Sequence, residues 1–162
     1  MTTKEKIVGL QSLQKKLASL RRMGKKIAFT NGCFDILHVG HVQYLESAKK
    51  ENRVLIVGLN SDLSVKKIKG PHRPVNPQAA RAAVLAALAC VDYVTIFTEE
   101  TPLKLISAIK PDILIKGADW KAKVIAGADV VKAYGGRIEL IKYVQGFSST
   151  NIIKSITSQC AQ

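Results

Sequence analysis

The stretch TNGCFDILHVGH at residues 30–41 joins an apolar run to an amphipathic helix, and this join constrains the fold more than any other part of the chain. The apolar residues at 27–29 come directly before it and are typical of a buried parallel strand. After Gly32 the pattern changes, because apolar side chains recur at helical spacing over 42–48 with charged residues opposite. The sequence therefore predicts a strand, a turn and a helix, with two histidines where the helix begins.

His38 and His41 lie at this predicted junction. Free backbone N–H groups and the positive end of the helix dipole meet there, which favours a bound phosphate. The two imidazoles are one helical turn apart, so both can donate to one polyphosphate, and Gly40 between them lets a ligand approach the backbone. Two alternatives stay open: a histidine that caps the helix, and a metal site. Helical zinc pairs are usually spaced i, i+4, and the remaining histidine, His72, lies in a predicted loop.

Strand and helix patterns alternate along the chain. Residues 3–23 are predicted to form an amphipathic helix that Gly24 ends. Strands are predicted at 26–31, 53–59, 92–97, 112–116 and 137–143, and further helices at 40–51, 77–89, 102–109, 127–134 and 148–158. Such alternation predicts an α/β fold, a single domain with a Rossmann-like doubly wound parallel sheet, helices on both faces, and ligands at the carboxyl ends of the strands. We divide the chain into an N-terminal helix, 1–24, and the domain proper, 25–158.

Composition limits the class of protein. The chain has 162 residues, of which 47% are hydrophobic and 23% charged, as in an ordinary folded domain. It has no run of 18 apolar residues, and its first residues lack the apolar core of a signal peptide, so we expect no membrane span and a cytoplasmic location. Cys33, Cys90 and Cys160 form no CxxC pair, which favours reduced thiols over a disulfide framework or a zinc site.

The chain is strongly basic, with 25 Lys and Arg against 12 Asp and Glu and a net charge of +13. Such an excess attracts polyanions, so a nucleic-acid-binding protein is the non-enzyme alternative. The basic residues are scattered, only 6% of residues are aromatic, and the sequence contains no nucleic-acid-binding motif. A positive field around a phosphate site explains the charge equally well, and we expect no specific nucleic-acid partner.

The HVGH at 38–41, preceded by GCFD at 32–35, resembles the HxGH signature of the cytidylyltransferase-like nucleotidyltransferases. Other segments resemble one branch of that superfamily, the heptose 1-phosphate adenylyltransferase part of ADP-heptose synthase. They include LNSDLSVKKIKG (59–70), RPVNPQAARAAVLAAL (73–88), KPDILIKGADW (110–120) and GFSSTNIIKSI (146–156). The resemblance covers residues 23–158 and implies transfer of a nucleoside monophosphate from ATP to a sugar phosphate, with release of pyrophosphate.

The resemblance also implies roles for individual residues. His38, His41, Lys67 and Lys69 would be catalytic, with the two lysines pointing the same way from an extended basic connection. Asp35 and Arg81 would bind the sugar phosphate. The nucleotide would lie against Thr30, Asn31, Gly32, Cys33, Phe34, Gly40, Lys116, Gly117, Asp119, Ser148, Ser149 and Thr150. The alternatives are a solvated lysine run, a surface arginine on helix 77–89, and a plain helix cap at 148–150.

The implied mechanism needs no general base, because the sugar phosphate is itself a nucleophile that attacks the α-phosphorus of ATP. Catalysis is then positioning plus stabilisation of the charge on the leaving pyrophosphate. We expect Mg²⁺ to be held mainly by the ATP phosphates, with no protein metal ligand. We also expect a homo-oligomer, with a dimer favoured, and a separate sugar kinase as pathway partner. The alternative enzyme is a cytidylyltransferase that acts on glycerol 3-phosphate or another polyol phosphate.

Overall fold

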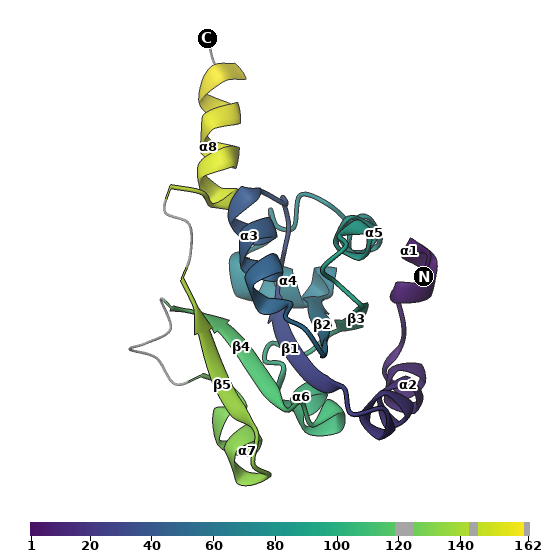
Figure 1. The fold of residues 1–162 in the computed structure, drawn as a ribbon. Helices are drawn as coiled ribbons and strands as arrows, with labels where there is room; N and C mark the ends of the chain where they lie inside the picture. The colour runs from purple at the N-terminus through teal and green to yellow at the C-terminus, as the bar shows by residue number, and fades with distance from the viewer. Residues whose placement is uncertain (119–124, 143–145, 161–162) are drawn as a thin grey trace.

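A single parallel sheet organises the protein, as seen in a computed structural model that describes residues 1–118, 125–142 and 146–160 (Figure 1). Within these ranges five strands pair in the order β3-β2-β1-β4-β5, all parallel. They are β1 (Lys26–Gly32), β2 (Arg53–Asn60), β3 (Tyr93–Phe97), β4 (Ile113–Gly117) and β5 (Arg137–Ile141). The chain moves outward from β1 to β3 and then returns to place β4 on the other side of β1. The predicted doubly wound sheet is confirmed, with its switch point between β1 and β4.

Helices cover both faces of the sheet. On one face, α3 (Val39–Ala48) and α5 (Gln78–Ala87) pack on a cluster that contains Ala28 and Leu55. On the other, α2 (Leu10–Arg22), α6 (Leu103–Ile109) and α7 (Ala128–Ala133) pack around Phe29 and Ile56. Successive side chains of a strand point to opposite faces, so neighbouring residues of β1 and β2 enter different clusters. Both faces of the sheet are therefore covered from solvent, and β2 is buried along its whole length.

The N-terminal segment differs from the continuous helix predicted over 3–23. A short helix, α1 (Thr3–Lys6), is followed by three non-helical residues, 7–9, before α2 begins. Ile7 forms a parallel bridge with Val94, and the Val8 N–H donates to the Val94 carbonyl at 2.9 Å, so this segment runs along the edge of β3. The helical prediction was wrong here because hydrogen bonds to a distant strand leave no trace in local spacing. In α2, Leu13 and Leu17 are at most 1% exposed and belong to the core.

A further helix replaces the predicted basic connection. α4 (Asp62–Lys69) begins at Ser61, whose hydroxyl accepts the Ser64 N–H at 3.2 Å. Val65 is fully buried and anchors the helix to the body, which explains why the segment is helical despite its lysines. The extended conformation expected for Lys67 and Lys69 was therefore wrong.

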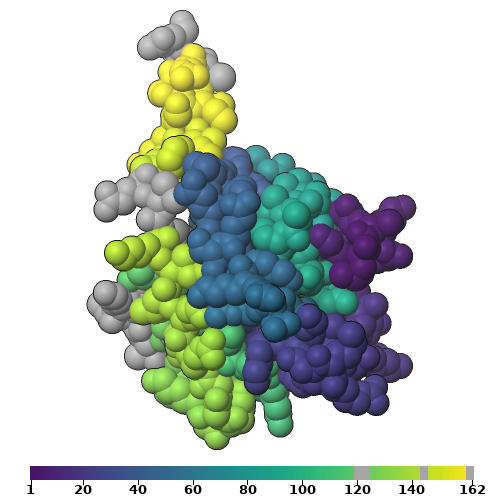
Figure 2. Space-filling model, viewed as in Figure 1, coloured from purple at the N-terminus to yellow at the C-terminus, as the bar shows by residue number. Residues whose placement is uncertain are grey.

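The last helix, α8 (Ser149–Cys160), begins beside α3 and projects away from the body of the protein. The space-filling view shows it as a separate protrusion above the start of α3 (Figure 2). Across the described ranges, the structure has no helix whose length and apolar character would allow it to span a membrane.

Candidate active site

The two histidines lie together where α3 begins, next to the carboxyl end of β1. Their rings stack with centroids 3.8 Å apart and planes 27° apart, and the ring of Phe34 lies 5.1 Å from that of His41. The main chain of His38 caps α3, because its carbonyl accepts the N–H of His41 at 2.9 Å, but its side chain makes no cap hydrogen bond. The imidazole of His38 is thus not the helix cap.

Both imidazoles have an unused ring nitrogen. Nδ1 of His38 and Nδ1 of His41 are buried, and neither has a hydrogen-bond partner in the described part of the chain. Burial lowers the pKa of His38, and burial together with the charge of His38 lowers the pKa of His41 to about 4. Without a ligand, both rings are therefore largely neutral near pH 7. Because buried polar atoms are nearly always hydrogen-bonded, this pair is an incomplete site that a ligand could complete.

Two glycines and one strained residue shape the loop that carries the histidines. A Cβ on Gly32 would lie 3.0 Å from the Phe34 ring, and a Cβ on Gly40 would lie 3.1 Å from Nδ1 of His38. Phe34 has a φ of 43°, in the left-handed region that residues other than glycine rarely adopt. Gly40 therefore makes room for the His38 ring, and the approach of a phosphate to its backbone stays a prediction.

The start of α8 lies against the same loop. The Ser149 hydroxyl donates to the Ile36 carbonyl at 3.1 Å, which ties α8 to the segment just before His38. The Ser148 hydroxyl accepts a main-chain N–H from the first turn of α8 at 3.0 Å and is the helix cap, whereas Thr150 is exposed. The structure thus places the start of α8 against the loop of the histidines through Ser149, and two of the three predicted hydroxyls already have protein partners.

Asn31 and Lys116 meet at the switch point, at the carboxyl ends of β1 and β4. Nζ of Lys116 donates to Oδ1 of Asn31, and Lys116 is only 7% exposed, so that burial lowers its pKa to about 8. Thr30 points to the opposite face, where its hydroxyl is buried and lies 2.8 Å from the hydroxyl of Tyr44. The Thr30 side chain therefore braces β1 against α3, and the predicted contact of this residue with the nucleotide stays a prediction.

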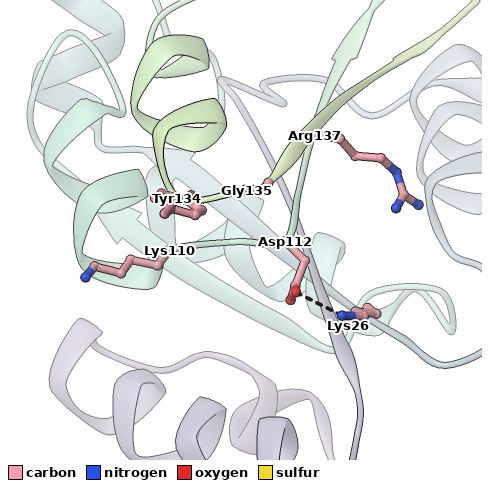
Figure 3. Close-up of a pocket in the computed structure, with 7 residues that line it drawn as sticks. Lys26, Lys110, Asp112, Tyr134, Gly135 and Arg137 are labelled. Atoms are coloured by element: carbon pink, nitrogen blue, oxygen red, sulfur yellow. Dashed lines mark hydrogen bonds and ion pairs between the residues drawn. The ribbon is translucent and has the colours of Figure 1, made fainter.

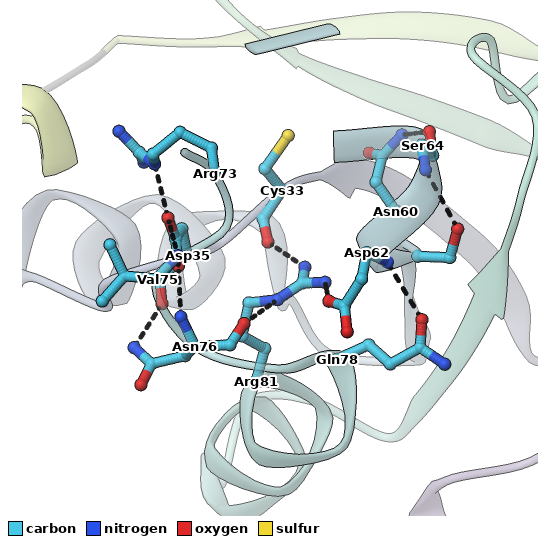
Figure 4. Close-up of polar contacts among 11 residues, drawn as sticks. Cys33, Asp35, Asn60, Asp62, Ser64, Arg73, Val75, Asn76, Gln78 and Arg81 are labelled. Carbon is cyan, nitrogen blue, oxygen red and sulfur yellow. Dashed lines mark hydrogen bonds and ion pairs between the residues drawn. The ribbon is translucent and has the colours of Figure 1, made fainter. Parts of the chain in front are cut away.

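The Arg81 side chain is hydrogen-bonded within the protein (Figure 4). Its side chain is fully buried, and it donates to the carbonyls of Cys33 at 2.6 Å and Asn76 at 2.9 Å and to Asp62 Oδ1 at 2.7 Å. Asp35 is also buried, and it holds the loop at 73–76. Both side chains thus anchor the loops around the site, and the contacts predicted from them to a sugar phosphate stay a prediction.

The two predicted catalytic lysines point in different directions. Residues two apart on a helix are separated by about 200° around its axis. Lys67 lies 3.9 Å from Glu100 in an exposed ion pair. Lys69 lies close enough to Cys33 to act on the pKa of its thiol, which burial raises and the Lys69 charge lowers. Of the two, Lys69 is thus the one that acts on the loop of the histidines.

A cavity of about 380 Å³ lies at the opposite edge of the sheet, by the amino ends of β1, β4 and β5. Lys26 forms an ion pair with Asp112 at 3.4 Å there, while Lys110 and Arg137 point away from each other (Figure 3). Because its cations do not converge, this cavity is not the candidate site.

The described ranges contain no group of three or more His, Cys, Asp or Glu side chains that could hold a metal ion. Cys33 and Cys90 are free thiols. Gly117 ends β4 and is buried beside the Asn31–Lys116 pair. Asp119, predicted to contact the nucleotide, lies outside the described residues.

The chain matches known proteins over most of its length. Residues 29–155 match the model of the cytidylyltransferase-like family. The bifunctional protein HldE of Syntrophotalea carbinolica is 51% identical over 152 residues, which are 94% of this chain and 31% of that protein. HldE of Campylobacter jejuni subsp. doylei is 56% identical over 147 residues, which are 91% of this chain and again 31% of the relative. The chain thus spans slightly less than a third of the length of these relatives.

Solved structures that resemble this one include two proteins with different names. The lipopolysaccharide core biosynthesis protein from Thermoplasma volcanium superposes with a TM-score of 0.59 at 27% identity, over 74% of this chain and 96% of that one. Pantoate-beta-alanine ligase from Francisella tularensis, in complex with beta-gamma ATP and beta-alanine, gives 0.61 at 18% identity, over 92% of this chain and 76% of that one; it supports the fold alone. The match to the family model covers well over half of the sequence, and the chain belongs to the cytidylyltransferase-like family.

Proposed function

We propose that this domain transfers AMP from ATP to D-glycero-β-D-manno-heptose 1-phosphate and releases pyrophosphate and ADP-heptose, a precursor of lipopolysaccharide core or a related glycan. The observation that carries the proposal is the stacked pair His38 and His41, each with a buried Nδ1 that has no partner in the described ranges. The choice of sugar rests on the family, on the segments beyond HxGH, and on the HldE relatives.

The geometry suits a polyphosphate. The histidines stand at the amino end of α3, where free N–H groups and the helix dipole favour an anion. An anion nearby raises the pKa of an imidazole, so a bound phosphate would draw protons onto the two neutral rings and strengthen their hydrogen bonds. The start of α8 and Lys69 are the further groups that we assign to the β- and γ-phosphates, with Lys67 reaching them only if α4 moves.

In this mechanism the sugar phosphate oxygen attacks the α-phosphorus of ATP in line, and the α–β bridging oxygen leaves with pyrophosphate. No side chain has to remove a proton, since the attacking phosphate is already ionised. The protein orients the two phosphates and stabilises the negative charge that grows on the leaving group. Mg²⁺ would be held by phosphate oxygens and supply further charge stabilisation. Homodimerisation, a sugar kinase activity that supplies heptose 1-phosphate, and a cytoplasmic location belong to the same proposal.

A substrate panel tests the proposal. Pyrophosphate release is measured with Mg²⁺ for ATP or CTP, each paired with heptose 1-phosphate or glycerol 3-phosphate. We expect turnover with ATP and heptose 1-phosphate. Turnover with CTP and glycerol 3-phosphate alone would instead support the alternative enzyme.

The paired histidines are tested separately. His41→Ala should lower turnover by about a hundredfold or more, as loss of a transition-state donor typically does. His38→Ala should act similarly, and the double variant should be less than additive because both rings serve one charge. His72→Ala is the matched control, since His72 is exposed in the loop after α4. Near-normal turnover of a folded His41→Ala protein would end the proposed mechanism, and lost metal with normal turnover would support the metal alternative.

A further inference from the structure

Basic side chains gather around Cys33, on the side of the histidine loop that faces α4 and α5. Burial raises the pKa of the Cys33 thiol, and the charges of Lys69, Arg81 and Arg73 act against that rise. Each of these cations therefore lies near the loop that leads to His38. Arg81 has its donors occupied within the protein, as described above, so Lys69 and Arg73 are the cations left to meet a ligand.

Arg73 is held by a carboxylate that is itself fixed. Its Nε donates to Asp35 Oδ2 at 2.6 Å. The Asp35 side chain is 1% exposed, and its other oxygen accepts the N–H of Val75 at 2.8 Å and of Asn76 at 2.9 Å. Burial raises the pKa of Asp35, but these N–H groups and Arg73 outweigh it and hold the pKa below its ordinary value. The ion pair thus persists at neutral pH, and one edge of the guanidinium is locked in place.

The other edge of the guanidinium has no partner among the residues that the structure describes. The Arg73 side chain is 20% exposed, and Nε is its one nitrogen that hydrogen-bonds within the described ranges. In Figure 4 the far end of the guanidinium points away from Asp35. An arginine fixed through Nε, with both terminal nitrogens free, matches a pair of phosphate oxygens and loses little side-chain freedom on binding.

We propose that Arg73 binds a phosphate group of one of the two substrates through its terminal nitrogens, in the reaction set out under Proposed function. Asp35 then acts as a positioning residue that aims this guanidinium. Phosphate is the shared chemistry of ATP and the sugar phosphate, and the experiment decides between the two sources.

A merely structural role for Arg73 predicts something different. Without Arg73, Asp35 would keep the N–H groups of Val75 and Asn76, and the Asn76 amide would still donate to the Asp35 carbonyl at 2.9 Å. The loop should therefore stay in place when Arg73 is shortened. Loss of affinity for phosphate in a protein of unchanged melting temperature would be the mark of direct binding.

The experiment compares Arg73→Gln and Arg73→Lys with Arg22→Gln, which removes one exposed positive charge from the end of α2. Titrations with ATP, pyrophosphate and inorganic phosphate are followed by calorimetry, and KM is measured for ATP and heptose 1-phosphate. Arg73→Gln should weaken binding of ATP, or raise KM for the sugar phosphate, by roughly tenfold or more. Arg73→Lys should recover only part of this loss, because an ammonium lacks the fork, and Arg22→Gln should change either value less than about twofold.

Unchanged titrations and KM values in folded Arg73→Gln would overturn the inference, as would equal losses in Arg22→Gln. If the wild-type protein binds ATP but does not turn over heptose 1-phosphate, the proposed function fails. The titrations with ATP, pyrophosphate and phosphate then still decide whether Arg73 binds an anion. A fall in melting temperature with unaltered phosphate affinity would assign Arg73 to the loop alone.

Discussion

Replacing His41 with phenylalanine should make the protein less sensitive to acid. The folded state holds the pKa of His41 at about 4, whereas the unfolded chain gives it the ordinary value of 6.5. Between these two pH values the unfolded chain binds a proton that the folded protein does not. The stability associated with His41 is therefore complete above pH 6.5 and is lost as the pH falls to about 4. In the phenylalanine variant nothing titrates at this position, and an aromatic ring remains to contact the tilted ring of Phe34.

The magnitude follows from the difference in pKa. At 1.36 kcal/mol per pH unit, the interval from 6.5 to about 4 corresponds to about 3 kcal/mol, and solvent around the partly exposed ring reduces this to about 2 kcal/mol. In a domain of this size that is a difference of about 4–8 °C in melting temperature. Melting curves at pH 7.5 and 4.5 measure it, as the acid-induced fall of the wild type minus that of His41→Phe. His72→Gln controls for loss of an imidazole away from the site and should follow the wild type. Identical falls in wild type and His41→Phe would refute the buried, neutral state assigned to the ring.

Three further predictions concern stability. Gly58→Ala should destabilise the protein by about 1–3 kcal/mol in denaturant titrations, because its Cβ would lie 2.7 Å from Cζ of Phe29 in the centre of the sheet; a neutral effect would show that the core can shift. Leu17→Ala should cost about 2–5 kcal/mol, since this fully packed side chain joins α2 to the sheet, and a loss under about 1 kcal/mol would mean that α2 is not part of the core. Hydrogen bonds from Arg53 lower the pKa of Glu139 to about 2, so this carboxylate stabilises the fold above pH 4.5 and loses that effect toward pH 2. Glu139→Gln should therefore lose less stability in acid than the wild type. An unaltered dependence of stability on pH in this variant would contradict the prediction.

The sheet and its order of elements were predictable because the strands are nearly uniform apolar runs separated by helical spacing. The site loop was predictable for a similar reason, since HVGH combines a helix start with two imidazoles. What escaped prediction was set by distant contacts. Val8 is not helical because its N–H donates to the Val94 carbonyl. The segment of α4 is helical, despite its exposed lysines, because Val65 is buried in the body of the protein.

The same limit applies to side-chain roles. The sequence around Arg81 is that of an ordinary surface helix, and the carbonyl acceptors of its side chain come from Cys33 and Asn76, which lie outside that helix. Arg73 carried no local signal at all, because its significance comes from a carboxylate 38 positions earlier in the chain. The order Ser61, Asp62 and Ser64 is a helix-start pattern that could have revealed α4 from sequence.

The pairing of residues 7 and 8 with β3 affects the tendency of this protein to aggregate in solution. β3 and β5 are the two outer strands of the sheet, and an outer strand with free N–H and C=O groups invites pairing with another chain. At β5, Arg137 and Glu139 oppose such pairing by their charge. At β3 this protection comes from the amino-terminal segment and its bridge to Val94. A chain shortened to begin at residue 25 would expose the edge of β3 and the apolar face of the sheet that α2 covers. We expect such a chain to aggregate before it can be assayed.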